Sequence, residues 1–144
     1  MHLNISRDTA VTIFMNILIA HCRNGTIKEV YDLLEDGPPV PEVQSNQMAT
    51  YQWYQTLNEQ GKQHIQYLVR EIVDSTLFST LVVLDGAAGG LPLQEQFSEF
   101  ALYLQTYETE ADEAIDNVKT RVRVNTKGVT EDLHDIFINS ISTP

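Results

Sequence analysis

A long stretch of helical periodicity constrains this chain more than any other feature of its sequence. Between Glu59 and Leu84, apolar residues recur every three or four positions and no proline interrupts them. That rhythm is typical of one face of an α-helix. The second half of the stretch, LFSTLVVL, is apolar on nearly every side, as in a helix that runs through a core. We therefore expect one long helix here, with Leu68 and Ile72 buried in the core.

Two shorter helices are predicted at the start of the sequence. Ser6 can cap the first of them, and the dipeptide Asn24-Gly25 is a typical helix stop. Thr26 and Glu29 then have the spacing of a capping box, which indicates that a second helix begins at that point.

The remaining helices are predicted from similar patterns. A helix is expected near 47–57, and Thr56 or Asn58 can cap the long helix that follows it. Thr130 can cap a last helix, whose apolar residues recur at helical spacing up to Ile141.

The alternation of side chains near the C-terminus predicts a strand. From Val118 to Asn125, apolar residues and threonine alternate with lysine and arginine, which is typical of a half-buried strand. Such a strand needs a partner, and the nearest candidate is Ala101–Tyr107. This candidate belongs to the stretch Phe97–Tyr107, whose pattern suits either a helix or a strand. The 144 residues therefore predict a single α+β domain, mainly helical, with about five helices and a small C-terminal β-ribbon.

The acidic residues are concentrated in one part of the sequence. The formal net charge is −11, and Glu71 to Val118 contains ten acidic residues and no lysine or arginine. A negative surface repels nucleic acid and anionic membranes, so the distribution favours a basic protein as the partner. Carboxylates and aromatic side chains of this segment are the expected partner-binding residues. They are Glu95, Glu99, Tyr103, Tyr107, Glu108, Glu110, Asp112, Glu113 and Asp116.

A simpler interpretation of the same charges remains open. Part of the acidic segment could pair across the ribbon with the basic side chains of Lys119, Arg121 and Arg123. The acidic residues would then serve only to keep the protein in solution. The sequence also contains one cysteine, no secretory signal and no apolar stretch long enough to span a membrane. We therefore expect a cytoplasmic protein that does not bind membranes.

Two features suggest chemistry. His134 lies beside Asp132 and Asp135, a grouping that could hold a metal ion or form a general base. The loop from Gly86 to Gly90 resembles the cofactor loop of methyltransferases, although its G-x-x-G-G spacing departs from the G-x-G pattern of such loops. The sequence predicts no catalytic group, metal or cofactor, and keeps a small metal- or cofactor-binding enzyme as the alternative.

The chain resembles the immunity proteins that bacteria keep against secreted toxins, including those of contact-dependent growth-inhibition systems. The resemblance lies in a small acidic single domain without a catalytic motif, and in the segment EQGKQHIQYLVREIVDSTLFSTLVVLDG followed later by a strand and DLHDIF. It implies a non-catalytic protein that neutralises a basic partner, such as a nuclease toxin, by binding over its active site.

Overall fold

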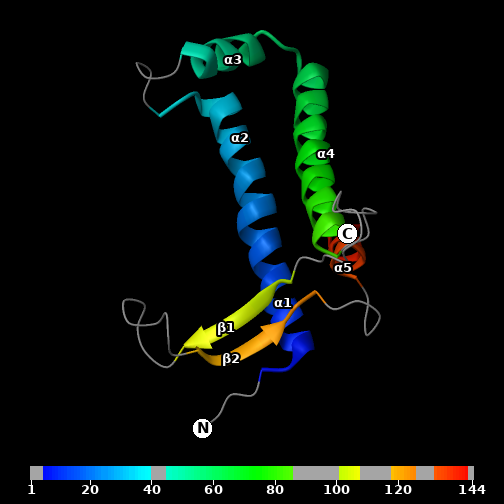
Figure 1. The fold of residues 1–144 in the computed structure, drawn as a ribbon. Helices are drawn as coiled ribbons and strands as arrows, with labels where there is room; N and C mark the ends of the chain where they lie inside the picture. Colours follow the sequence, from blue (N-terminus) through cyan, green and yellow to red (C-terminus); the bar gives the residue numbers. More distant parts are fainter. Residues whose placement is uncertain (1–4, 40–44, 86–100, 108–117, 126–131, 143–144) are drawn as a thin grey trace, which may run out of the picture. The chain divides into compact units, whose positions relative to one another are not determined.

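The computed structural model describes residues 5–39, 45–85, 101–107, 118–125 and 132–142. Helices account for most of these residues, and a two-stranded antiparallel sheet precedes the last helix in the sequence (Figure 1). The elements in chain order are α1 (Arg7–Ile17), η1 (Leu18–Gly25), α2 (Thr26–Asp36), α3 (Ser45–Gln55), α4 (Glu59–Leu84), β1 (Tyr103–Tyr107), β2 (Val118–Arg123) and α5 (Leu133–Ser142). The predicted α+β class, mainly helical with a small ribbon, is confirmed.

The first three elements follow one another without a break in the helix. Ser6 caps α1 as predicted, since its Oγ accepts the Thr9 backbone N–H at 3.2 Å. The stop expected at Asn24-Gly25 was wrong, because Gly25 has helical dihedral angles (φ −60°, ψ −51°). The chain passes from α1 through the π-helical segment η1 directly into α2. No side chain caps the start of α2, so the capping box expected from Thr26 was also wrong.

The glycine with a positive φ lies twelve residues after Gly25, at the end of α2, where the sequence GPP predicts that this helix ends. Gly37 adopts φ 84°, and its N–H donates to the Leu33 carbonyl oxygen at 3.1 Å. This hydrogen bond satisfies a carbonyl in the last turn of α2. The next helices begin close to their predicted positions. Asn58 caps α4 by accepting the Gly61 N–H at 2.8 Å, and α4 spans the predicted range of 59–84.

The chain divides into two compact units. One comprises Met1–Ile17 together with Phe78–Pro144, and the other comprises Leu18–Leu77. The first unit contains α1, the β-ribbon and α5, and the second contains η1, α2 and α3. Helix α4 contributes its N-terminal part to the second unit and its C-terminal end to the first. The expectation of a single domain over 1–144 stays a prediction.

The ribbon pairs the strand predicted from Val118 with the segment that the sequence left undecided. Tyr103 lies opposite Arg123, and Thr106 lies opposite Thr120, with a bulge between Thr106 and Tyr107. Residues 103–107 are therefore a strand, and the helical alternative is wrong for them; 97–100 lie outside the described residues.

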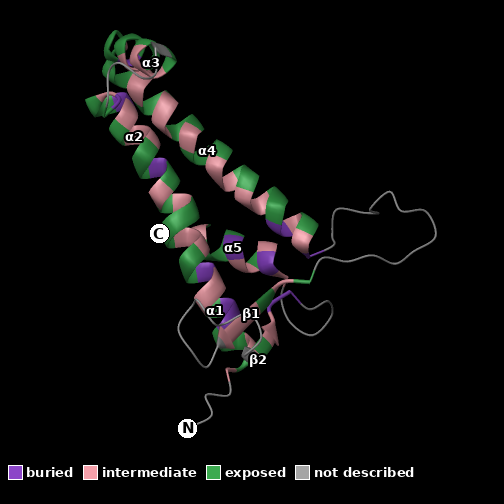
Figure 2. Cartoon of the chain, turned by 60° about the vertical axis from the view of Figure 1, so that its left-hand side comes forward, coloured by how far each residue is buried: buried purple, intermediate pink, exposed green. Residues whose placement is uncertain are grey.

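Each unit has buried apolar side chains among its described residues. In the described part of the first unit they are Ala10, Val11, Met15, Leu81, Val124, Leu133 and Phe137, and in that of the second they are Ile27, Leu34 and Tyr54. Long stretches of α4 are only half-buried or exposed (Figure 2). The predicted burial of Leu68 and Ile72 was wrong, because the two residues are 50% and 64% exposed. Among the described residues, no helix is long and apolar enough to cross a membrane.

Candidate functional site

Most of the residues predicted to bind a partner lie outside the described part of the chain. These are Glu95, Glu99, Glu108, Glu110, Asp112, Glu113 and Asp116. Tyr103 and Tyr107 are described, and they form the two ends of β1. The structure therefore places two of the nine predicted residues on one short strand, and the rest stay predictions.

Tyr103 carries a contact that the sequence pattern did not predict. Its ring is exposed, and the guanidinium carbon of Arg121 lies 3.8 Å from the ring centroid. This distance is typical of a cation–π contact, in which the arginine stacks on the face of the ring. The guanidinium of Arg123 donates from Nε to the Asn125 carbonyl oxygen at 2.9 Å. Both arginines of β2 therefore have contacts at the ribbon itself.

Helix α4 presents one continuous exposed face in the second unit, which we call the outer face of α4. Its residues follow the i, i+3, i+4, i+7 spacing of neighbours on a helix surface. They are His64, Tyr67, Leu68, Glu71, Ile72 and Ser75, and all six are exposed. Tyr67 is 59% exposed, which matches the exposure of Leu68 and Ile72. The outer face thus combines one aromatic and two aliphatic side chains with a single carboxylate and no lysine or arginine.

The other side of α4 is occupied by contacts within the second unit. Asp74 accepts two hydrogen bonds from the Arg23 guanidinium, at 2.5 Å from Nε and 2.9 Å from Nη2. The Tyr31 hydroxyl donates to the Gln66 carbonyl oxygen at 2.7 Å. The bidentate geometry favours the arginine in its charged form, and the pKa of Arg23 is raised mainly by its hydrogen bond to Asp74.

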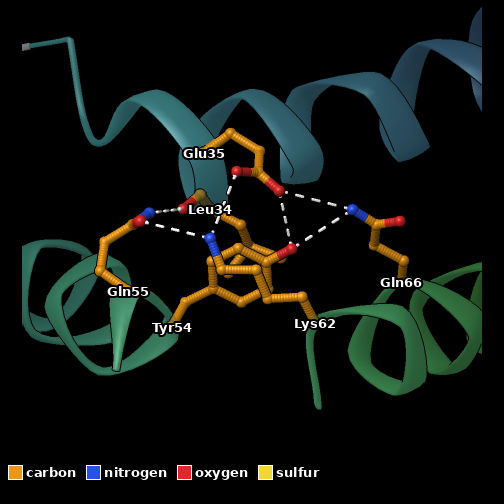
Figure 3. A network of polar contacts seen from close by, with 6 residues as sticks. All are labelled: Leu34, Glu35, Tyr54, Gln55, Lys62 and Gln66. Carbon is orange, nitrogen blue, oxygen red and sulfur yellow. Dashed lines mark hydrogen bonds and ion pairs between the residues drawn. The ribbon is translucent and has the colours of Figure 1, made fainter. Parts of the chain in front are cut away.

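A polar network joins α4 to α2 and α3 around the buried Tyr54 (Figure 3). The Tyr54 hydroxyl donates to Glu35 Oε1 at 2.8 Å and accepts from Gln66 Nε2 at 3.3 Å. The Lys62 ammonium lies 4.9 Å from the centroid of the Tyr54 ring and 3.8 Å from Glu35 Oε2. These contacts hold the inner side of α4, and none of them involves the outer face.

The second candidate site lies in the first unit, where α5 begins. Asp85 follows the last residue of α4, and its side chain is only 3% exposed. One oxygen, Oδ2, accepts the His134 backbone N–H at 3.0 Å and also lies 2.8 Å from His134 Nδ1. The carboxylate therefore satisfies one of the free N–H groups in the first turn of α5 and holds the imidazole at the same time.

The other sides of the His134 ring are also defined. The Phe78 ring packs edge-on against it, with a centroid distance of 5.5 Å and an interplanar angle of 87°. The second ring nitrogen, Nε2, lies 3.7 Å from Asp135 Oδ1. Ligand atoms of Asp132, His134 and Asp135 all lie within 4.8 Å of one another.

His134, Asp132 and Asp135 were predicted as a possible site, whereas no site role was predicted for Asp85. Asp85 lies at the end of α4, where its backbone N–H donates to the Leu81 carbonyl oxygen at 2.8 Å. Its side chain, however, contacts a residue 49 positions further along the chain. A local sequence motif cannot predict a contact between residues so far apart in the chain. The alternative cofactor loop at Gly86–Gly90 lies outside the described residues.

A scan against protein-family models, a search of curated proteins and a search of solved structures each returned no match to this chain. The resemblance to immunity proteins stays a prediction.

Proposed function

We propose that this chain acts by binding, and that it covers a basic and partly apolar surface of another protein. The observation that carries the proposal is the outer face of α4, where Tyr67, Leu68 and Ile72 lie exposed on successive turns. An exposed aliphatic residue is ordinary when it stands alone, whereas adjacent large apolar side chains on one helix face are typical of protein-binding surfaces.

The composition of this face suits recognition of a helix in a groove. Tyr67, Leu68 and Ile72 lie at positions i, i+1 and i+5 of α4, which places them on two neighbouring turns of the same face. Their side chains could enter an apolar groove on the partner. Aromatic side chains contribute much of the energy at such interfaces. Glu71 lies between Tyr67 and Ile72 and would meet a basic residue at the edge of the groove.

The charge distribution supports a basic partner. Ten acidic residues and no basic residue occur from Glu71 to Val118, and a field of that sign accelerates the encounter with a positively charged protein. A nuclease toxin has such a surface, because it must hold the phosphates of its substrate. We therefore propose the more specific role of an immunity protein, which blocks a nuclease toxin without catalysing a reaction and acts in the cytoplasm.

The experiment pairs this chain with the protein encoded beside its gene and measures association and dissociation rates. The double variant Leu68→Ala/Ile72→Ala should raise the dissociation rate at least about tenfold, since truncated interface residues act mainly on dissociation. Ile138→Ala is the matched control, because Ile138 is also an exposed aliphatic residue on a helix but lies in the other unit. Equal rates for the double variant and the unchanged chain would overturn the assignment of the outer face.

The acidic segment is tested separately. Changing Glu108, Glu110, Asp112 and Glu113 to glutamine should slow association and flatten its dependence on salt, while dissociation changes little. If the partner is a nuclease toxin, the unchanged chain should inhibit cleavage of RNA or DNA at a one-to-one ratio. Binding without any loss of nuclease activity would contradict the immunity role and leave the binding role intact.

A further inference from the structure

His134 is held in one orientation by three contacts of different kinds. Asp85 Oδ2 lies 2.8 Å from Nδ1, the same oxygen accepts the His134 backbone N–H, and Phe78 packs against the ring. A carboxylate that accepts from Nδ1 requires the proton to be on that nitrogen. In the neutral imidazole, Nε2 then carries the lone pair.

The lone pair of Nε2 lies beside negative charge. Asp135 Oδ1 is 3.7 Å from Nε2, and a carboxylate oxygen of Asp132 belongs to the same cluster, within 4.8 Å of the other ligand atoms. A lone pair and a carboxylate oxygen repel one another at such a distance, as do two neighbouring carboxylates, unless a cation lies between them. The His134 side chain is 15% exposed, so part of the imidazole meets solvent.

We propose that His134 Nε2, Asp132 and Asp135 form a binding site for a divalent transition-metal ion of the Zn²⁺ type. One imidazole nitrogen with two carboxylate oxygens is a donor set that suits Zn²⁺, whereas Ca²⁺ and Mg²⁺ prefer oxygen ligands alone. This site goes beyond the proposed binding function and does not depend on it.

The geometry is close to what such an ion requires. Ligand atoms around a tetrahedral Zn²⁺ lie about 3.3 Å apart, given bonds of roughly 2.0 Å. The separation of 3.7 Å between Nε2 and Asp135 Oδ1 needs only a small adjustment, whereas the cluster as a whole, whose ligand atoms lie within 4.8 Å of one another, must close further around an ion. Asp135 is exposed and Asp132 half-buried, so their side chains can rotate toward the ion. Three protein ligands leave the fourth position open to water.

Asp85 has the position of the outer partner that orients a metal-binding histidine. Such a histidine commonly donates its second ring N–H to a carboxylate, which fixes the tautomer and makes the other nitrogen a better ligand. The sequence predicted no metal because His134 and its neighbours alone resemble an ordinary acidic first turn of a helix. The contact with Asp85 is the additional observation that changes this interpretation.

The test is a calorimetric titration of the full chain, stripped of metal with a chelator, with Zn²⁺. We expect one Zn²⁺ per chain, loss of saturable binding in His134→Ala, and an affinity 10–100-fold lower in Asp85→Asn, as for other outer partners of metal ligands. Asp135→Asn removes a ligand at an exposed position and should weaken binding without affecting the fold. His21→Gln is the control, because His21 is exposed on η1 in the other unit.

A second measurement needs no variant. On addition of Zn²⁺ to the unchanged protein, the Nε2 resonance of His134 should shift in imidazole ¹⁵N spectra while the Nδ1–H is retained. Absence of saturable binding, a shift at Nδ1 instead, or equal affinity in His134→Ala would each overturn the site. A spectrum in which Nε2 is protonated and does not respond to Zn²⁺ would also overturn the site, because a proton rather than a metal ion would then lie beside the carboxylates. Partner binding measured in the presence of chelator tests the proposed function independently.

Discussion

The hydroxyl of Tyr54 donates a 2.8 Å hydrogen bond to Glu35 Oε1 and thereby ties α3 to α2 from within the core of the second unit (Figure 3). The Tyr54 residue is fully buried, whereas the Glu35 side chain is 44% exposed. A buried hydroxyl thus reaches a carboxylate at the edge of the unit. Two measurable consequences follow from this arrangement.

Replacing Tyr54 by phenylalanine should lower the free energy of unfolding by about 1–2 kcal/mol. The ring and its packing are retained, and the loss is that of a hydrogen bond to a charged acceptor. Urea unfolding at neutral pH measures the change. Tyr67→Phe is the control, because the Tyr67 side chain is exposed and should lose nothing measurable. Equal stability of Tyr54→Phe and the unchanged protein would show that the hydrogen bond contributes no net stability.

The stability should also fall at alkaline pH because of Tyr54. Burial, and next the hydrogen bond to Glu35, raise the pKa of Tyr54 above its ordinary value of about 10. At pH values above about 10 the unfolded chain loses the phenol proton while the folded chain keeps it, so the unfolded state is favoured as pH rises. The decline should be smaller in Tyr54→Phe. Urea unfolding at several pH values between about 8 and 11 compares the two slopes.

Two glycines should respond to alanine with opposite signs. Gly37 has φ 84°, and an added Cβ would lie 3.4 Å from the Tyr51 ring, so Gly37→Ala should cost about 1–2 kcal/mol. Gly25 has helical angles, and its added Cβ would lie 3.7 Å from the Ala20 carbonyl oxygen, an ordinary contact. Gly25→Ala should therefore stabilise by about 0.5–1 kcal/mol. Thermal and urea unfolding of both variants test the pair, and destabilisation by Gly25→Ala would argue for a real helix break at that position.

Two apolar truncations should separate the core from the outer face of α4. Phe137→Ala should cost about 3–5 kcal/mol, because Phe137 is fully buried. Ile72→Ala should change the stability of the isolated chain by less than about 0.5 kcal/mol, since Ile72 is largely exposed. Urea unfolding measures both. A large loss for Ile72→Ala would mean that another part of the chain covers the outer face in solution, and the proposed binding surface would then be withdrawn.

Local patterns predicted the elements well where a strong period and a cap agree. The apolar rhythm of 59–84 and the cap at Asn58 both belong to the sequence immediately around α4, and the helix has the predicted bounds. The alternation from Val118 likewise predicted β2. The helix stop predicted at Asn24-Gly25 was wrong because glycine permits a left-handed conformation without requiring it. Gly25 has helical dihedral angles, so η1 continues into α2.

Contacts between distant residues could not be predicted in this way. The period of α4 shows which residues share a face, but not whether that face meets the core or solvent, so Leu68 and Ile72 were assigned to the wrong environment. Asp85 and His134 are 49 residues apart, and their pairing depends on where α5 begins relative to the end of α4. Tertiary structure alone supplies that information.

The side chain of Asn125 gives the short ribbon a fixed alignment. Its Oδ1 accepts the Leu102 N–H at 2.7 Å, and its Nδ2 donates to the Leu84 carbonyl oxygen at 2.5 Å, so one amide joins the ribbon to the end of α4. An isolated pair of five- or six-residue strands is marginally stable and can slip by one residue. Slippage here would break the bond between the Leu102 N–H and the buried Asn125 amide. The Leu102 N–H should accordingly exchange with deuterium as slowly as the strand amides, although it precedes the strand, and Asn125→Ala should make the whole ribbon exchange rapidly.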